Sequence, residues 1–199
     1  MWNPSKSPPE GDQPRAFDPS VPRRAPDLPF PPYRHLPGQT PHPHTHPDGH
    51  SYQRETACDS PALRSENWQS NRAYLFGTDL YNYAYWWEAH EQWEVLWHLA
   101  GRHSLCGQYL QGLIQTAAAF IKWHQGNQRG RDKLWEQGRH KLVEVLDVQE
   151  VYMGLDLVDF LQRTGQFFCG CGNAAPMNFT GGNVDRAPLL HLRTVHIRG

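Results

Sequence analysis

The residues of this chain that could do chemistry are a histidine and several carboxylates on one predicted helical segment. His90 and Glu94 are four residues apart, so their side chains point the same way from adjacent helical turns. At 100° per residue both fall inside an arc of apolar residues, whereas Glu91 lies on its rim and Glu88 lies far outside it. An imidazole and a carboxylate placed in this way can chelate a divalent metal ion or transfer a proton. We therefore take His90, Glu91 and Glu94 as candidate catalytic residues, and His90 and Glu94 as candidate metal ligands.

A second polar pair lies on the next predicted helix. Gln111 and Gln115 are one turn apart on the margin of an apolar arc, where each unpaired polar group would cost about 1 to 3 kcal/mol. One hypothesis is an open site with hydrolase-like chemistry, in which these amides orient a small molecule and Trp87 and Trp97 form its walls. The alternative is a non-enzymatic structural or interaction module, whose His, Glu and Gln side chains form a closed hydrogen-bond network that fixes helix packing.

Two known metal motifs are incomplete here. The string His90-Glu91-Gln92-Trp93-Glu94 has Glu where a zincin motif has its second His. A carboxylate-bridged di-metal bundle needs Glu-x-x-His on two helices, and the second helix here supplies only glutamines, which are weak ligands. A metal site would therefore need water or residues from elsewhere in the chain to complete its coordination.

Other clusters of potential ligands favour non-functional explanations. Glu136, His140 and Glu144 recur every four residues, but they lie opposite the apolar stripe of their segment, which is typical of a solvated face. Residues 41–50 form a histidine-rich tract that could bind a transition metal loosely, although composition-biased disorder explains it better. Cys169-Gly170-Cys171 lacks a partner pair for a structural zinc site unless Cys58 or His191 joins it.

Composition excludes several classes of function. The formal net charge is −1, so no global field attracts nucleic acid or an anionic membrane. The four cysteines are too irregularly spaced for a disulfide framework, and the N-terminus has no apolar core like that of a signal peptide. The longest apolar run, near residues 113–121, is too short to span a bilayer. We expect a cytoplasmic protein that binds neither nucleic acid nor membrane, and homo-oligomerisation is left open.

The distribution of proline divides the chain into three parts. Fifteen of the 17 prolines lie at or before Pro61, so residues 1–65 are predicted to be a disordered tail rich in proline and histidine. Residues 66–168 are predicted to be an all-α bundle of about five helices, and residues 169–199 a mostly irregular tail with a weak apolar cluster at 189–192. The expected helices cover about 68–80, 85–100, 105–124, 129–146 and 156–163, and Ser104 and Asp156 are the expected N-caps of the third and the last.

The linked motifs of the central segment resemble a known family. They are Leu80-Tyr81-Asn82, Trp87-Glu88-Ala89-His90-Glu91 with Glu94 and Trp97, Gln111-Gly112-Leu113-Ile114-Gln115, and Gly126-Asn127 with Gly130. This pattern is similar to that of domain of unknown function 309, a family of small helical proteins, over about residues 73–168. The resemblance implies a helical bundle and no established activity. It places His90, Glu91, Glu94, Trp97, Gln111 and Gln115 at characteristic positions, whereas Ala84 stands where many members have Gly.

Overall fold

The computed structural model describes residues 21–53, 61–170 and 187–193. It confirms an all-α fold with five helices in the described residues, together with two very short strands. The helices have nearly the predicted limits, except that the first begins later than residue 68 and the last continues well beyond residue 163. In chain order the elements are α1 (Arg72–Asn82), α2 (Trp86–Ala100), α3 (Leu105–His124), α4 (Gln128–Leu146), β1 (Val151–Tyr152), β2 (Leu155–Asp156) and α5 (Leu157–Gly170).

Local capping explains where the helices begin and end. The Ser104 hydroxyl accepts a hydrogen bond from the Gly107 N–H at 2.9 Å, which confirms Ser104 as the predicted N-cap of α3. Gly101 ends α2 with a φ of 81°, a left-handed conformation that glycine adopts at little cost. The start of α1 was predicted about four residues too early. Asn71 caps this helix by accepting from the Tyr74 N–H, so the helix begins only at Arg72.

The two strands form a small hairpin between α4 and α5 that the sequence analysis did not predict. Val151 pairs with Asp156 and Tyr152 pairs with Leu155 in an antiparallel arrangement. The two turn residues, Met153 and Gly154, both have positive φ, which is the backbone geometry of tight two-residue hairpins. The sequence at this turn is Met-Gly rather than the usual Asn-Gly or Asp-Gly, so the familiar hairpin signal is absent.

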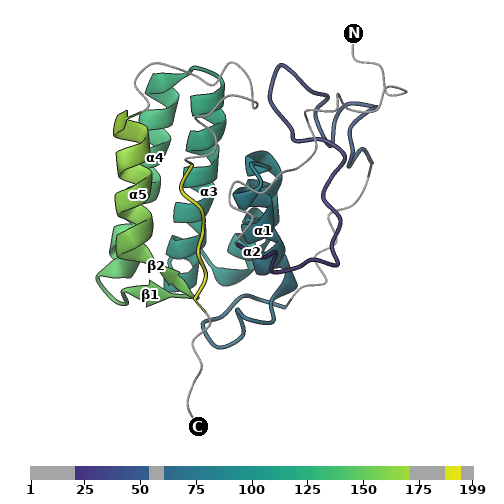
Figure 1. The fold of residues 1–199 in the computed structure, drawn as a ribbon. Helices are drawn as coiled ribbons and strands as arrows, with labels where there is room; N and C mark the ends of the chain where they lie inside the picture. The colour runs from purple at the N-terminus through teal and green to yellow at the C-terminus, as the bar shows by residue number, and fades with distance from the viewer. Residues whose placement is uncertain (1–20, 54–60, 171–186, 194–199) are drawn as a thin grey trace.

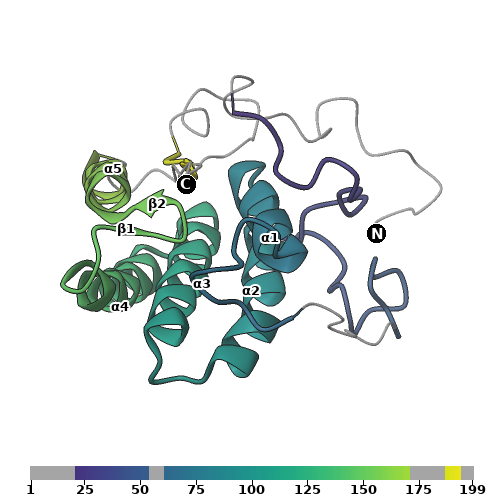
Figure 2. The same ribbon diagram turned by 90° about the horizontal axis from the view of Figure 1, so that it is seen from below.

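Helix α3 lies at the centre of the bundle. Figure 1 shows α4 and α5 on one side of α3 and the α1–α2 pair on the other, and Figure 2 shows the same order from below. Because both sides are covered, α3 is buried on its α4 side, at Gly112 and Thr116, as well as on the predicted apolar arc. Among the described helices, none combines the length and the apolar character that crossing a bilayer requires.

Aromatic side chains join the two sides of the bundle. Phe120 of α3 stacks on Trp86 of α2, with ring centroids 5.0 Å apart, and contacts Phe168 of α5 at 4.7 Å. Tyr81 of α1 meets the Phe120 ring at 5.8 Å. These rings are almost fully buried, so one aromatic core holds α1, α2, α3 and α5 together.

The crossing of α3 and α4 depends on two glycines. A Cβ atom on Gly112 would lie 2.6 Å from Cγ of Leu142, and one on Gly138 would lie 3.0 Å from the Gly112 carbonyl oxygen. Real Cβ atoms essentially never show a contact as short as the one at Gly112, and the one at Gly138 is unusually tight, so glycine at both positions favours the close approach of the two backbones. At the same crossing, Gln115 of α3 lies beside α4. A Cβ atom added at Gly138 would lie 3.2 Å from the Cβ atom of Gln115.

Helix α1 holds segments from both ends of the chain. The buried Asp79 carboxylate accepts hydrogen bonds from the backbone N–H groups of Arg24 and Ala25, at 2.7 and 2.8 Å. The Asn82 side chain exchanges two hydrogen bonds with the backbone of Leu190, at 2.8 and 3.1 Å. Residues 187–193 lie between α1 and α5, and residues 21–53 lie on the outer side of α1 and α2 (Figures 1 and 2). Composition did not indicate these contacts of the two flanking segments.

A buried histidine near the end of α3 predicts acid sensitivity. Burial, together with the nearby positive charge of Arg34, lowers the pKa of His124 to about 4. Between pH of about 6.5 and 4 the unfolded chain therefore binds a proton that the folded chain does not bind. We expect the free energy of unfolding to fall as the pH drops through this range, and His124→Gln to remove that part of the loss. Urea denaturation at pH 7 and pH 5 measures both effects, and equal pH dependence in the two proteins would contradict this assignment.

Candidate functional site

The candidate residues on α2 form a half-buried row beside the core. Trp87, His90, Glu94 and Trp97 follow one another at spacings of three, four and three residues, so they share one side of the helix. Each is partly buried, next to the fully buried stripe that contains Trp93. His90 and Glu94 were predicted to lie inside the apolar arc. They do lie next to the buried stripe, but both side chains are only partly buried.

Helix α3 also has an arc of half-buried residues. With Leu110 set at 0° around the helix, its members fall within an arc about 120° wide, and one of them, Gln115, lies beside Gly138 of α4. They are Gln108, Gln111, Ile114, Gln115 and Ala118. We call the polar and tryptophan side chains of the two helices the polar row: Trp87, His90, Glu94 and Trp97 on α2 with Gln108, Gln111 and Gln115 on α3. The sequence analysis had not selected Gln108.

Several atoms of the polar row are buried without a hydrogen-bond partner. These atoms are Nδ1 of His90, Oε1 of Gln108, Oε1 of Gln115, and Nε1 of Trp87 and Trp97. No hydrogen bond joins any two of His90, Glu94, Gln111 and Gln115 among the described residues. The structure therefore lacks the bonds that a closed network among these four side chains requires. Buried polar atoms without partners are uncommon in folded proteins, and each one needs an explanation such as a bound water or ligand.

The arrangement offers a metal ion few ligands. Within the described residues, no three His, Cys, Asp or Glu side chains are grouped so that they could hold a metal ion. His90 and Glu94 would supply two ligands, and the glutamines of α3 are weak ones. A divalent metal at this position stays a prediction, and the chemistry proposed below does not depend on it.

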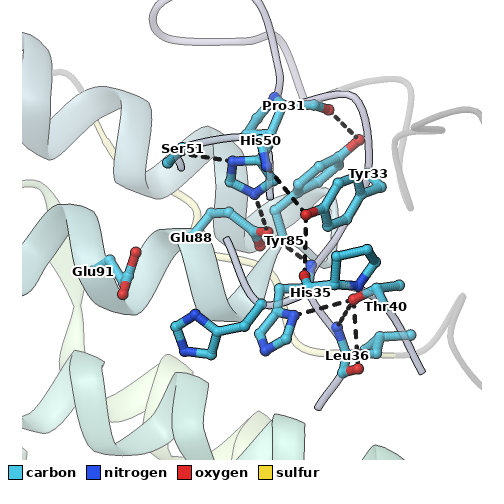
Figure 3. A network of polar contacts seen from close by, with 12 residues as sticks. Pro31, Tyr33, His35, Leu36, Thr40, His50, Ser51, Tyr85, Glu88 and Glu91 are labelled. Atoms are coloured by element: carbon cyan, nitrogen blue, oxygen red, sulfur yellow. Dashed lines mark hydrogen bonds and ion pairs between the residues drawn. The ribbon is translucent and has the colours of Figure 1, made fainter. Parts of the chain in front are cut away.

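A carboxylate on the opposite side of α2 is more deeply buried than the polar row. Glu88 is only 6% exposed, although helical periodicity placed it far outside the apolar arc. Its Oε1 accepts a hydrogen bond from the backbone N–H of His35 at 2.7 Å and lies 3.1 Å from Nε2 of His50. Figure 3 shows the Glu88 side chain pointing between His50 and the His35 backbone. Glu88 is buried because the N-terminal segment covers this side of the helix.

The same segment carries further histidines to the beginning of α2. Nε2 of His44 lies 2.6 Å from Oε2 of Glu91. The rings of His35 and His42 meet Trp87 edge-on, at centroid distances of 4.7 and 5.4 Å. Burial lowers the pKa of His35, and the neighbouring His42 lowers it further, so His35 packs against the indole as a neutral ring. The Trp87 ring also lies 5.7 Å from the His90 ring, so Trp87 contacts both the N-terminal segment and the next residue of the polar row.

The comparison with protein families identifies the segment that carries the polar row. The model of a family described as "Domain of unknown function (DUF309)" matches residues 74–134. Residues 74–134 are therefore similar to DUF309. The match confirms the family resemblance for α1, α2, α3 and the beginning of α4, and every residue of the polar row lies within it. Comparison with curated proteins gives no match.

The turn between α1 and α2 explains one departure from the DUF309 pattern. Ala84 has a φ of 62°, so it adopts the left-handed conformation that favours glycine. The resemblance places glycine at this position in many members of the family. An alanine in this conformation stores strain of about 1 kcal/mol. The DUF309 segment of this chain keeps the turn because Ala84 is itself almost fully buried against the core.

Of the other clusters considered from the sequence, the one on α4 lies on a solvated face, and the cysteine cluster is only partly described. Glu136 and His140 are exposed on α4, and His140 pairs with Glu144 at 3.0 Å on the solvated face that was predicted. Cys169 is exposed near the end of α5. Its predicted companion Cys171 lies outside the described residues, as does Cys58.

Sequence reasoning had little means of finding the buried Glu88. Helical periodicity describes which residues share a side of one helix, but it cannot reveal a covering segment about 40 residues earlier in the chain. The only hint was the unusual density of histidine in residues 41–50, which we interpreted through composition. In the structure, His44 and His50 from this tract pair with Glu91 and Glu88.

Proposed function

We propose that the polar row is a binding site for a small organic molecule, with acid–base chemistry of a hydrolytic type at His90 and Glu94. The observation that carries this proposal is the set of buried polar atoms without partners, among them Nδ1 of His90 and Oε1 of Gln115. Their number is hard to reconcile with a row that serves packing alone, because each unpaired group lowers stability. A ligand that supplies hydrogen-bond donors and acceptors would satisfy them.

The residue types define the chemical class of the ligand. The Gln108 and Gln115 oxygens require donors such as amide or hydroxyl groups, and the Trp87 and Trp97 N–H groups require acceptors. The indole rings provide flat apolar surfaces. The ligand expected from this set is a small planar molecule that carries both donors and acceptors, such as an amide or a nitrogen heterocycle. His90 and Glu94, one turn apart, are the groups that would move a proton on it.

A stability measurement separates this proposal from a closed packing network. Gln115→Met keeps the volume of the side chain and removes its buried amide oxygen. Because this oxygen has no partner, we expect the free energy of unfolding in urea to stay level or to rise by about 1 kcal/mol. A closed network predicts the opposite, namely a loss of about 1 to 3 kcal/mol.

Ligand capture tests the same proposal directly. Native mass spectrometry of the purified full chain, followed by a fragment screen by NMR, should find ligands that shift the tryptophan indole N–H signals. His90→Ala should abolish these shifts, whereas His140→Ala should retain them because His140 lies exposed on α4. Fragment shifts that persist in His90→Ala, or a crystal structure with only ordered water on the row, would refute a ligand site here.

A further inference from the structure

Residues 35–50 form a distinct strap on the first turns of α2. We call this segment the histidine strap. Its polar contacts with α2 join the His50 ring and the His35 N–H to Glu88, and the His44 ring to Glu91. In addition, the rings of His35 and His42 pack against Trp87. Among these contacts, the His50–Glu88 pair is deeply buried, with side chains 6% and 5% exposed.

Anchored parts of the chain lie on both sides of the histidine strap. After it, Leu63 is buried in the core, and its carbonyl accepts a hydrogen bond from the Cys106 thiol at 3.4 Å. Before the strap, the backbone of Arg24 and Ala25 is bound to Asp79, and the Tyr85 hydroxyl donates to the Pro31 carbonyl at 3.2 Å. The strap itself is closed by turns within the segment, such as the hydrogen bond from the Ser51 N–H to the Pro43 carbonyl. Between residues 37 and 50 it contains no aliphatic or aromatic side chain other than proline and histidine. Although Pro41 and Pro43 are buried, a segment this poor in apolar side chains opens at a lower free energy than the core of its domain.

The position of the histidine strap links it to the polar row. Trp87 belongs to the row, and it is covered by His35 and His42 on one side while its ring lies 5.7 Å from His90 on the other. Glu91, which holds His44, directly follows His90 on α2. Detaching the strap would therefore uncover the end of the row that Trp87 forms.

We propose that the histidine strap is a lid over the Trp87 end of the polar row, which opens while the helical bundle stays folded. This inference rests on the proposed binding function of the row. The imidazole–carboxylate pairs at Glu88 and Glu91 hold the lid closed, and opening lets a ligand reach the Trp87 indole. The contacts on both sides of the strap, at Asp79 before it and at Leu63 after it, stay in place while the strap moves away from α2.

Hydrogen–deuterium exchange of the full chain tests the lid. In the wild type we expect the amides of the strap to exchange at least tenfold faster than those of α3, with a rate that low concentrations of urea do not change. Glu91→Gln removes the charge from the half-exposed pair with His44, and it should speed exchange of the strap by about two- to fivefold. Glu144→Gln removes the same kind of His–Glu pair on α4 and should leave the strap unchanged.

A tryptophan probe shows whether the opening uncovers the row. In protein labelled with 5-fluorotryptophan, the ¹⁹F signal that disappears in Trp87→Phe belongs to Trp87. A soluble gadolinium chelate should broaden this signal more strongly in Glu91→Gln than in the wild type or Glu144→Gln. The lid is refuted if the strap exchanges only by global unfolding, if Glu91→Gln and Glu144→Gln behave alike, or if Trp87 is equally accessible in all three proteins. None of these readouts uses a ligand, so failure of the proposed function would leave them standing.

Discussion

Replacing Asp79 by alanine is expected to lower the free energy of unfolding by about 3 to 5 kcal/mol. The Asp79 carboxylate is only 2% exposed, and it accepts two backbone N–H hydrogen bonds from Arg24 and Ala25 while lying 3.4 Å from Nε of Arg23. Removing it leaves these donors without an acceptor, unless the N-terminal segment leaves α1 and returns them to water. Chemical denaturation measures the loss, and hydrogen exchange of residues 24–35 shows whether the segment has detached.

Two further variants make the Asp79 result specific. Asp27→Ala removes a carboxylate from an exposed pair with Arg72, so it should leave the stability unchanged within error. Asp79→Asn keeps one oxygen that can accept a backbone N–H bond, so its loss should lie between those of the two alanine variants. An Asp79→Ala protein as stable as Asp27→Ala would mean that residues 21–53 do not dock on α1 in solution.

The substitution Gly77→Ala is expected to lower the free energy of unfolding by about 1 to 3 kcal/mol. A Cβ atom at position 77 would lie 2.3 Å from Nε1 of Trp93, whose ring is fully buried and has no space into which it could move. Trp93 would have to shift and would lose its 3.4 Å hydrogen bond to the Tyr74 carbonyl. This clash outweighs the gain of about 0.5 to 1 kcal/mol that alanine brings inside a helix. Thermal and urea denaturation measure the net change.

A second helical glycine provides the matched control for Gly77. At Gly165 of α5, an added Cβ would meet only Cζ2 of Trp135 at 3.9 Å, which is an ordinary contact. Gly165→Ala should therefore raise the stability by about 0.5 to 1 kcal/mol, because only the helix-forming effect of alanine remains. Opposite signs for the two substitutions would show that α1 and α2 approach each other as closely as the structure indicates. A stabilising Gly77→Ala would contradict that close packing.

The sequence by itself determined the helices and the shared side of α2 on which His90 and Glu94 lie. Helical periodicity placed both residues inside the apolar arc of α2, and the structure finds them half-buried beside the fully buried stripe. The N-caps Ser104 and Asp156 could be predicted from the sequence because capping is local. In each case the side-chain oxygen accepts a hydrogen bond from the N–H group three residues later. The family resemblance was readable from linked local motifs, and the match over residues 74–134 confirms it.

Only the tertiary structure decided what covers each side of these helices. Gly112 permits α4 to approach α3 closely, so α3 is buried on its α4 side as well as on the predicted arc. Glu88 is buried by residues about 40 to 50 positions earlier, and irregular backbone carries no periodicity from which such a contact could be read. Whether His90 and Gln115 bond to each other also depends on the distance between two helices, which neither helix encodes alone. Local patterns set the direction of a side chain, whereas its partners depend on segments that meet only after the chain has folded.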